Sequence, residues 1–234
     1  MKILVLTAAF LCAQLLSAAE LPAGYKLIYE QKFDTEASLK GFQMTDTNAW
    51  KWVSTGDDHG GALELTQQSK YKPAVRSPVN IALITEKVFT DFVIEVEMLQ
   101  TGREYGHRDM CIFYGFQSPT TFYYTHIATA ADPNAHNTFI VDGAPRKNFA
   151  SETTKGVNWG LNVWHKVRIE RTVKDGMIKV YFDDLSKPIM IAQNDKFKSG
   201  GIGFGSFDDT GRIDNIRIWG PQVESKALPA FPKE

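Results

Sequence analysis

The chain has 234 residues and a formal net charge of -1. This length suits one large domain with a single hydrophobic core. The charge is nearly neutral and forms no basic stripe, whereas affinity for a phosphate backbone depends on clustered Lys and Arg. We therefore expect no nucleic-acid partner.

Residues 1–19 have the pattern of a secretory signal peptide. A lysine follows the initiator methionine, residues 3–16 form an apolar run, and residues 17–19 supply small side chains for cleavage. The run is too short to span a membrane well and no later stretch is a candidate, so we expect a secreted or periplasmic protein without a membrane span. Loss of Cys12 with this segment leaves Cys111 alone, which excludes an intramolecular disulfide.

Alternating apolar and polar residues between turn signals predict a single all-β domain over residues 20–222. A short helical turn is expected at 34–40, a loop at 50–61 and a poorly ordered, proline-containing tail at 223–234. The predicted strands cover residues 25–33, 62–66, 80–85, 91–100, 108–117, 121–129, 137–141, 166–172, 177–183 and 212–219. So many short strands favour a sandwich or a barrel.

The last third of the chain carries the elements that indicate the type of sandwich. They are Trp164-His165-Lys166-Val167-Arg168-Ile169, Ile178-Lys179-Val180-Tyr181-Phe182-Asp183, Gly200-Gly201-Ile202-Gly203 and Asp214-Asn215-Ile216-Arg217-Ile218. This series resembles the closing strands of concanavalin A-like lectin/glucanase jelly rolls, and its last two elements are similar to those of LamG-like and 3-keto-disaccharide hydrolase-type domains. The resemblance implies an all-β, two-sheet antiparallel jelly-roll sandwich and a polysaccharide or oligosaccharide partner, but no particular activity.

Two neighbouring predicted strands carry candidate catalytic residues. Alternation places His107 and Asp109 on one face of the first strand, and Tyr124 and His126 on one face of its hairpin partner. His126 or Tyr124 is the candidate acid or base, and His107 and Asp109 would orient it. The alternatives are a surface ion pair at the strand start and an aromatic–histidine pair satisfied inside the sandwich.

Candidate substrate-binding residues lie around these strands. His136 is one candidate, and Arg146, presented by a tight turn beside it, is another, because a guanidinium suits bidentate contact with a carboxylate or a sulfate. Arg103 stands just before the first strand, and Trp159 offers an indole that could stack on a sugar ring. The simpler interpretation of Arg146 is an ordinary exposed loop charge.

Paired carboxylates do not match a known glycosidase pattern. Glu95 and Glu97 share a face, but Leu99 stands where the retaining glucanases of this superfamily have a third carboxylate, so their mechanism is not carried over. Asp208 and Asp209 are interpreted as turn residues. No cofactor is required, although the resemblance implies a structural calcium site that Glu30 and Asp214 match in outline; an alternative is that Asp214 pairs with Arg212.

These features predict a secreted carbohydrate-active protein. The leading hypothesis is a polysaccharide-degrading hydrolase or lyase that uses His/Tyr acid–base chemistry in a concave groove. The main alternative is a lectin-like module that binds carbohydrate without chemistry, and a third is an envelope structural protein. Fold alone does not separate them.

Overall fold

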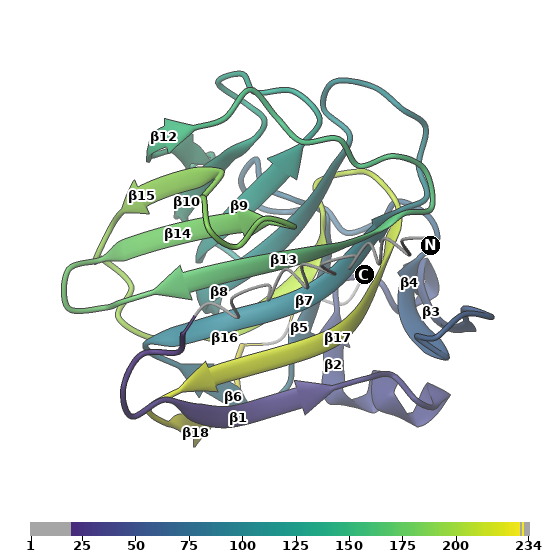
Figure 1. Cartoon of the computed structure of the whole chain (residues 1–234), viewed down its shortest axis with the longest axis horizontal. Coiled ribbons are helices and arrows are strands. Elements are labelled where there is room, and N and C mark those ends of the chain that lie inside the picture. The colour runs from purple at the N-terminus through teal and green to yellow at the C-terminus, as the bar shows by residue number, and fades with distance from the viewer. Residues whose placement is uncertain (1–19, 230, 232–234) are drawn as a thin grey trace, which may run out of the picture.

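The computed structural model describes residues 20–229 and 231, so the predicted signal peptide at 1–19 lies outside the described residues. Two antiparallel β-sheets stack face to face in this part of the chain (Figure 1). The predicted all-β, two-sheet jelly-roll sandwich is thereby confirmed.

The nine-stranded sheet lies at the front in Figure 1 and has the order β12-β15-β14-β13-β7-β17-β4-β3, with β1 also paired to β17. The first and last long strands of the domain, β1 and β17, therefore lie side by side. The strands are β1 (Lys26–Gln31), β3 (Trp50–Ser54), β4 (Gly61–Leu65), β7 (Phe92–Gln100), β12 (Ala150–Thr153), β13 (Trp164–Arg171), β14 (Met177–Phe182), β15 (Met190–Gln193) and β17 (Gly211–Gly220).

The seven-stranded sheet lies behind it and has the order β11-β10-β9-β8-β16-β5-β2. Its strands are β2 (Phe42–Met44), β5 (Asn80–Ile84), β8 (Asp109–Ser118), β9 (Thr121–Ala128), β10 (Asn137–Asp142), β11 (Lys147–Asn148) and β16 (Gly201–Ser206). A small ribbon joins β6 (Lys87–Phe89) to β18 (Val223–Ser225), and two 3-10 turns span Glu36–Gly41 and Thr47–Ala49.

The long predicted strands match observed ones with shifts of a few residues at their ends, and the predicted β8–β9 hairpin is present. The predicted loop at 50–61 is wrong in its first half, because Trp50–Ser54 form β3. This strand pairs with β4 and buries the Trp50 side chain, a contact that outweighs the turn-rich composition of the residues after it.

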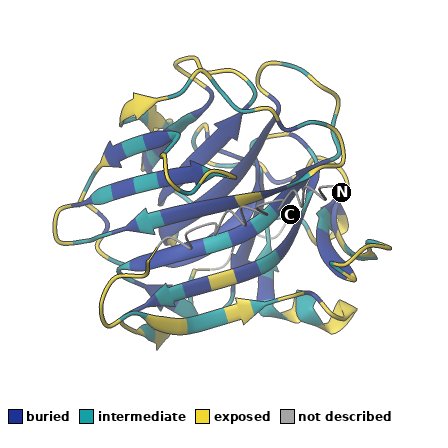
Figure 2. Ribbon diagram, viewed as in Figure 1, coloured by how far each residue is buried: buried dark blue, intermediate teal, exposed yellow. Residues whose placement is uncertain are grey.

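The main core lies between the two sheets. Alternate residues of β7 meet alternate residues of β8 there, with Ile94 and Val96 on one side and Met110 and Ile112 on the other. The strands of the front sheet show the same period in Figure 2, where buried positions alternate with half-buried or exposed ones. Burial of one face of each sheet is the main force that holds the sandwich together.

The outer face of the seven-stranded sheet carries a second apolar layer, which we call the outer aromatic layer. Its sheet residues are Ile81, Leu83, Cys111, Phe113, Phe116, Phe122, Tyr124, Phe139 and Val141. Two segments cover it: the loop between β4 and β5, through Tyr71 and Val75, and the C-terminal segment, through Leu228 and Phe231.

The C-terminal segment differs from its prediction. A disordered tail was expected from residue 223, but Val223–Ser225 form β18 and pair with β6. Further on, the Phe231 ring packs edge-to-face against Phe116 and Tyr71 and is only 5% exposed. These ring contacts hold Phe231 against the sheet.

Candidate functional site

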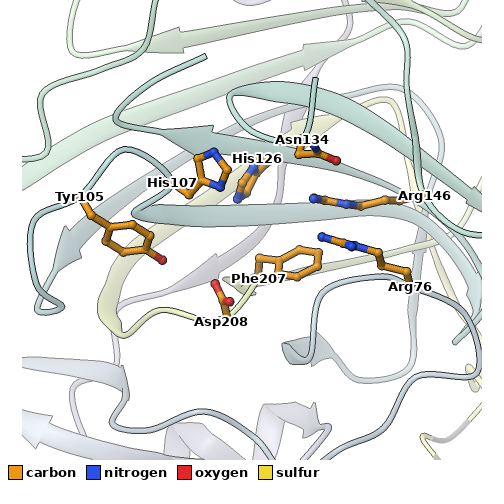
Figure 3. A pocket seen from close by; sticks show the side chains of 8 residues that line it. All are labelled: Arg76, Tyr105, His107, His126, Asn134, Arg146, Phe207 and Asp208. Carbon is orange, nitrogen blue, oxygen red and sulfur yellow. The ribbon is translucent and has the colours of Figure 1, made fainter. Parts of the chain in front are cut away.

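A pocket of about 170 Å³ opens at one end of the seven-stranded sheet, where β8 begins and β9 ends (Figure 3). Loops supply most of its wall, and His126 comes from β9 itself. The lining residues are Arg76, Tyr105, His107, His126, Asn134, Arg146, Phe207 and Asp208. Three predicted site residues, His107, His126 and Arg146, therefore share one pocket.

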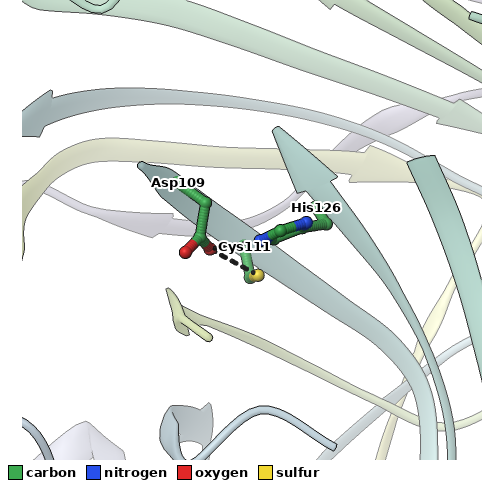
Figure 4. A group of neighbouring side chains, drawn as sticks. All are labelled: Asp109, Cys111 and His126. Carbon is green, nitrogen blue, oxygen red and sulfur yellow. Dashed lines mark hydrogen bonds and ion pairs between the residues drawn. The ribbon is translucent and has the colours of Figure 1, made fainter. Parts of the chain in front are cut away.

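Asp109 is fully buried next to this pocket and organises the residues around it (Figure 4). One carboxylate oxygen accepts a hydrogen bond from the Ser206 hydroxyl at 3.0 Å. The other accepts the Phe207 backbone N–H at 3.0 Å and the Cys111 thiol at 3.0 Å. The first residue of β8 is thus tied to the loop that begins at the end of β16.

His126 makes an ion-pair contact with this carboxylate. Its Nε2 lies 3.3 Å from Asp109 Oδ2, and the side chain is almost completely buried. Burial by itself would raise the pKa of Asp109, but the neighbouring His126 ring and the donors from Cys111 and Phe207 hold that pKa below its ordinary value. Asp109 is therefore an ionised carboxylate in contact with an imidazole, and this contact helps to set the position of the His126 ring.

A second pair of carboxylates borders the same network. Asp209 accepts hydrogen bonds from the Tyr105 hydroxyl at 2.8 Å and from the Asp109 N–H at 3.1 Å. Burial and the charge of Asp109 raise the pKa of Asp209 to about 7, and the same two causes raise the pKa of Asp208. These residues, predicted as simple turn residues, are acids of the pocket region.

Arg146 is held rigidly at the pocket. Its guanidinium lies over the rings of Phe139 and Phe207, with the guanidinium carbon 4.7 Å and 4.2 Å from the two centroids. It donates a hydrogen bond to the Tyr124 hydroxyl at 2.8 Å. Within the described part of the chain, neither Arg146 nor Arg76 forms an ion pair with a carboxylate. Two cations thus line the pocket without an ion-pair partner, and Asp208, which lines the same pocket, interacts with Arg146 at longer range.

Two predicted roles need correction. His107 precedes β8 and pairs with Asp132 at 2.5 Å instead of orienting His126, because the loop after β9 brings that carboxylate to it. Tyr124 lies inside the outer aromatic layer, stacked on Phe139, where burial raises its pKa well above the ordinary value. A phenol with so high a pKa stays protonated at neutral pH and is not available as a base; its hydroxyl accepts the hydrogen bond from Arg146 instead.

Three predicted substrate-binding residues lie elsewhere. His136 is buried, where its Nδ1 accepts the Ala128 N–H at 3.3 Å and its Nε2 lies 2.9 Å from the Thr154 hydroxyl. Trp159 is 1% exposed in the main core, where it cannot stack on a sugar. Arg103 stacks over Tyr105 at 5.0 Å and so lies beside a pocket residue without lining the pocket.

The two predicted calcium ligands are not equivalent. Glu30 accepts from Arg217 at 3.1 Å and is partly exposed. Asp214 is fully buried, and neither of its carboxylate oxygens has a hydrogen-bond partner among the described residues. Burial raises the pKa of Asp214 to about 7. A buried carboxylate without a donor carries a charge that a hard cation such as calcium would neutralise, whereas the Glu30 carboxylate is already paired with Arg217.

The pocket network offers other sets of metal-ligating atoms. Asp109, Cys111 and His126 place one ligand atom each within 4.8 Å of one another, as do Asp109, Asp208 and Asp209. In the first set Asp109 already accepts from the thiol, so the group is held together by its own contacts.

Sequence reasoning missed five of the eight lining residues. Arg76, Tyr105, Asn134, Phe207 and Asp208 come from four different loops, and no periodic pattern marks a loop residue as part of a site. The one available signal was the adjacent pair Asp208-Asp209 directly after a glycine-rich strand. Because such pairs are common in turns, this pair was interpreted as turn residues and not as part of a site.

The fold and the pocket define a β-sandwich with a small polar pocket at one end. No protein-family model matches the chain, and no curated protein matches it. Several solved structures share its fold. In the described residues no helix has the length and apolar character needed to cross a membrane.

Three of these structures illustrate the likeness. A carbohydrate binding module, CBM66 from Bacillus subtilis, has a TM-score of 0.52 at 15% identity, covering 79% of this chain and 96% of the module. A Bacillus subtilis protein of unknown function with a galectin-like fold has a TM-score of 0.54 at 12% identity, with 87% and 99% covered. Domain 4 of AbnA, an extracellular arabinanase from Geobacillus stearothermophilus in complex with arabinotriose, has a TM-score of 0.51 at 11% identity, with 87% and 94% covered. At these identities the likeness establishes the lectin-like sandwich fold alone.

Proposed function

We propose that this protein binds carbohydrate through the pocket beside Asp109, and that its preferred sugar carries a carboxylate or a sulfate. The observation that carries the proposal is the Arg146 guanidinium, which lies between two aromatic rings and has no carboxylate partner in the described chain. A fixed guanidinium suits planar, bidentate contact with such an anion. Arg76 adds a second positive charge at the pocket.

His126 is the proposed acid–base group. In a lyase-type reaction its imidazole would take the proton on C5, next to the uronic carboxyl group, the electron pair would form the C4–C5 double bond, and the C4–O bond would break to release the other sugar, while Arg146 neutralises the carboxylate. In a hydrolase the imidazolium would donate a proton to the glycosidic oxygen. Asp109 positions the ring in both cases, since its carboxylate contacts Nε2.

A binding module without chemistry is the second candidate function. His126 is only 3% exposed, so its ring nitrogens offer little surface to a substrate, and Tyr124 is sequestered by Arg146. The lectin-like fold is compatible with either function. We also propose that the protein works outside the cytoplasm, on the sequence of residues 1–19 alone.

Incubation with a panel of neutral, uronic and sulfated polysaccharides tests the proposal. Ultraviolet absorbance from unsaturated products would indicate a lyase, and new reducing ends without that absorbance would indicate a hydrolase. Binding of acidic polymers without turnover would indicate the module. Equal binding of neutral and acidic polymers, or binding of neither, would contradict the acidic-sugar proposal.

We further propose a structural calcium ion at Asp214, without Glu30. The support is the buried carboxylate whose oxygens have no protein donor. Calcium would neutralise the negative charge of the Asp214 carboxylate, and we assign it no role in the pocket.

A further inference from the structure

The seven-stranded sheet does not offer the open groove expected from the sequence. On its outer face, Phe113, Phe122 and Tyr124 are fully buried, although they sit on the two strands that lead away from the pocket. A long sugar chain laid across this sheet would need these side chains to be accessible. They form the outer aromatic layer instead.

Two segments from distant parts of the chain seal this layer. Tyr71 and Phe231 meet edge-to-face at 5.7 Å, so the β4–β5 loop and the C-terminal segment contact each other across it. Leu228 lies directly on β16: a Cβ atom added at Gly201 would lie 2.4 Å from its Cδ1. The cover is close-packed over Gly201, and a separate hollow of about 470 Å³ lies beside Leu228, next to Phe116 at the far end of β8 from the pocket.

On the side of Arg146, two linked segments border the pocket next to the covered face of the sheet. The Arg146 backbone N–H donates to the Arg76 carbonyl at 2.9 Å, which ties the β10–β11 turn to the β4–β5 loop. Both of these residues line the pocket (Figure 3), so the joined segments border it on the side of the outer aromatic layer, where Arg146 lies over the Phe139 ring. A chain that enters the pocket meets these segments and the buried layer on that side.

The volume of the pocket limits the size of the ligand that it can hold. Its volume of about 170 Å³ lies below the range of about 300–1,000 Å³ that is typical of sites for drug-sized ligands. One charged sugar ring fits such a volume better than several consecutive ones. The two unpaired guanidinium groups then meet the anion of that single ring.

We propose that the pocket binds the terminal unit of an acidic saccharide, with the remainder of the chain pointing into solvent, and not an internal segment. This inference rests on the proposed function and narrows it to chain ends. If the protein is an enzyme, it removes or modifies one terminal unit at a time. If it is a binding module, each molecule binds one chain end.

Chain-length dependence of binding tests this proposal. Oligosaccharides of two, four and eight units are prepared from polygalacturonate, alginate and chondroitin sulfate, and each series is titrated into the full-length protein by calorimetry. Recognition of ends predicts that molar affinity stays within about twofold across a series, because no further unit makes contact. The intact polymers should compete in proportion to the molar concentration of their ends, and not to their mass.

Recognition of internal segments predicts the opposite. Molar affinity would then rise by about tenfold or more from two to eight units, since about 1.4 kcal/mol of added contact suffices for that change. Such a rise would overturn the terminal-unit proposal and leave the acidic-sugar proposal standing. Absence of binding by all three series would overturn both.

Discussion

At the scale of single residues, Asp109 links the pocket to the sheet. Its carboxylate accepts from the Ser206 hydroxyl, the Phe207 amide and the Cys111 thiol, and it contacts His126. All of these contacts come from residues close to the pocket. One buried charge therefore fixes both a strand end and the imidazole proposed for catalysis.

Substitution of Asp109→Asn tests this role. An amide presents N–H groups to donors that need acceptors, and removal of one partner of a buried ion pair costs about 3–5 kcal/mol. We expect a loss of that order in the free energy of unfolding, measured by urea denaturation at pH 7. Asp208→Asn is the matched control, because the Asp208 carboxylate makes no hydrogen bond or ion pair with the described residues, and it should change stability by less than about 1 kcal/mol. Equal effects of the two substitutions would show that Asp109 has no special structural role.

His136 predicts a dependence of stability on pH. Burial lowers its pKa from 6.5 to about 4, so the unfolded chain takes up a proton at a pH where the folded chain does not. The free energy of unfolding is therefore unaffected by this group above about pH 6.5. It decreases as the pH falls towards 4, by at most about 3 kcal/mol.

His136→Asn isolates this effect. The residue has a φ of 49°, a conformation that asparagine tolerates better than most residues. Urea unfolding of wild type and variant at pH 7 and pH 4.5 should show the wild type losing more stability than the variant on acidification. Parallel losses in the two proteins would exclude His136 as the titrating group.

At the scale of elements, the C-terminal segment acts as part of the cover over the outer aromatic layer. Phe231→Ala should lower the free energy of unfolding by about 2 kcal/mol, the cost of exposing a buried aromatic side chain. It should also increase binding of a hydrophobic dye, because Phe116 and Tyr71 lose a neighbour. Lys226→Ala, an exposed position in the same segment, should do neither. A Phe231 variant as stable as wild type, with no added dye binding, would mean that the segment does not hold the cover in place.

Strand β17 carries the proposed calcium site at Asp214, next to the irregular register between residues 214 and 217. Addition of calcium to metal-free protein should raise the melting temperature, and a chelator should reverse the rise. Asp214→Asn should abolish the response and, without metal, should be at least as stable as wild type, because a neutral amide costs less to bury than an unpaired carboxylate. Glu30→Gln should keep the calcium response. An unchanged response in Asp214→Asn would place the ion elsewhere.

Local patterns explain which elements were predictable. Strands with strict alternation, such as β7 and β13, were found, and the faces of Asp109, Cys111 and His126 followed from period and hairpin pairing. β18 and the closure over the outer aromatic layer were missed, because Phe231 meets residues far away in the sequence. His107 was assigned the wrong partner for the same reason: Asp132 lies in a different loop.

At the scale of the whole molecule, the two outer faces of the sandwich differ. The nine-stranded sheet carries ion pairs, such as Arg168 with Glu95 and with Glu170, both at 2.9 Å. The seven-stranded sheet is covered by an aromatic layer, with the polar pocket at one end of β8 and a hollow beside Leu228 at the other. Of these two openings, only the pocket is lined by Arg146 and His126, which is why we assign the function there.

The most direct test of this account is the affinity of an acidic saccharide for the Arg146→Ala variant. Calorimetry with galacturonate oligomers at low salt should show a loss of about tenfold or more relative to wild type, as expected for one charge-assisted hydrogen bond worth about 1.5–3 kcal/mol. The loss should shrink as salt is added, because screening weakens the attraction that Arg146 provides. Lys147→Ala, the neighbouring exposed cation outside the pocket, is the control and should bind as wild type does. Equal affinities of the Arg146 and Lys147 variants, both close to wild type, would contradict the proposal that this pocket recognises an acidic sugar.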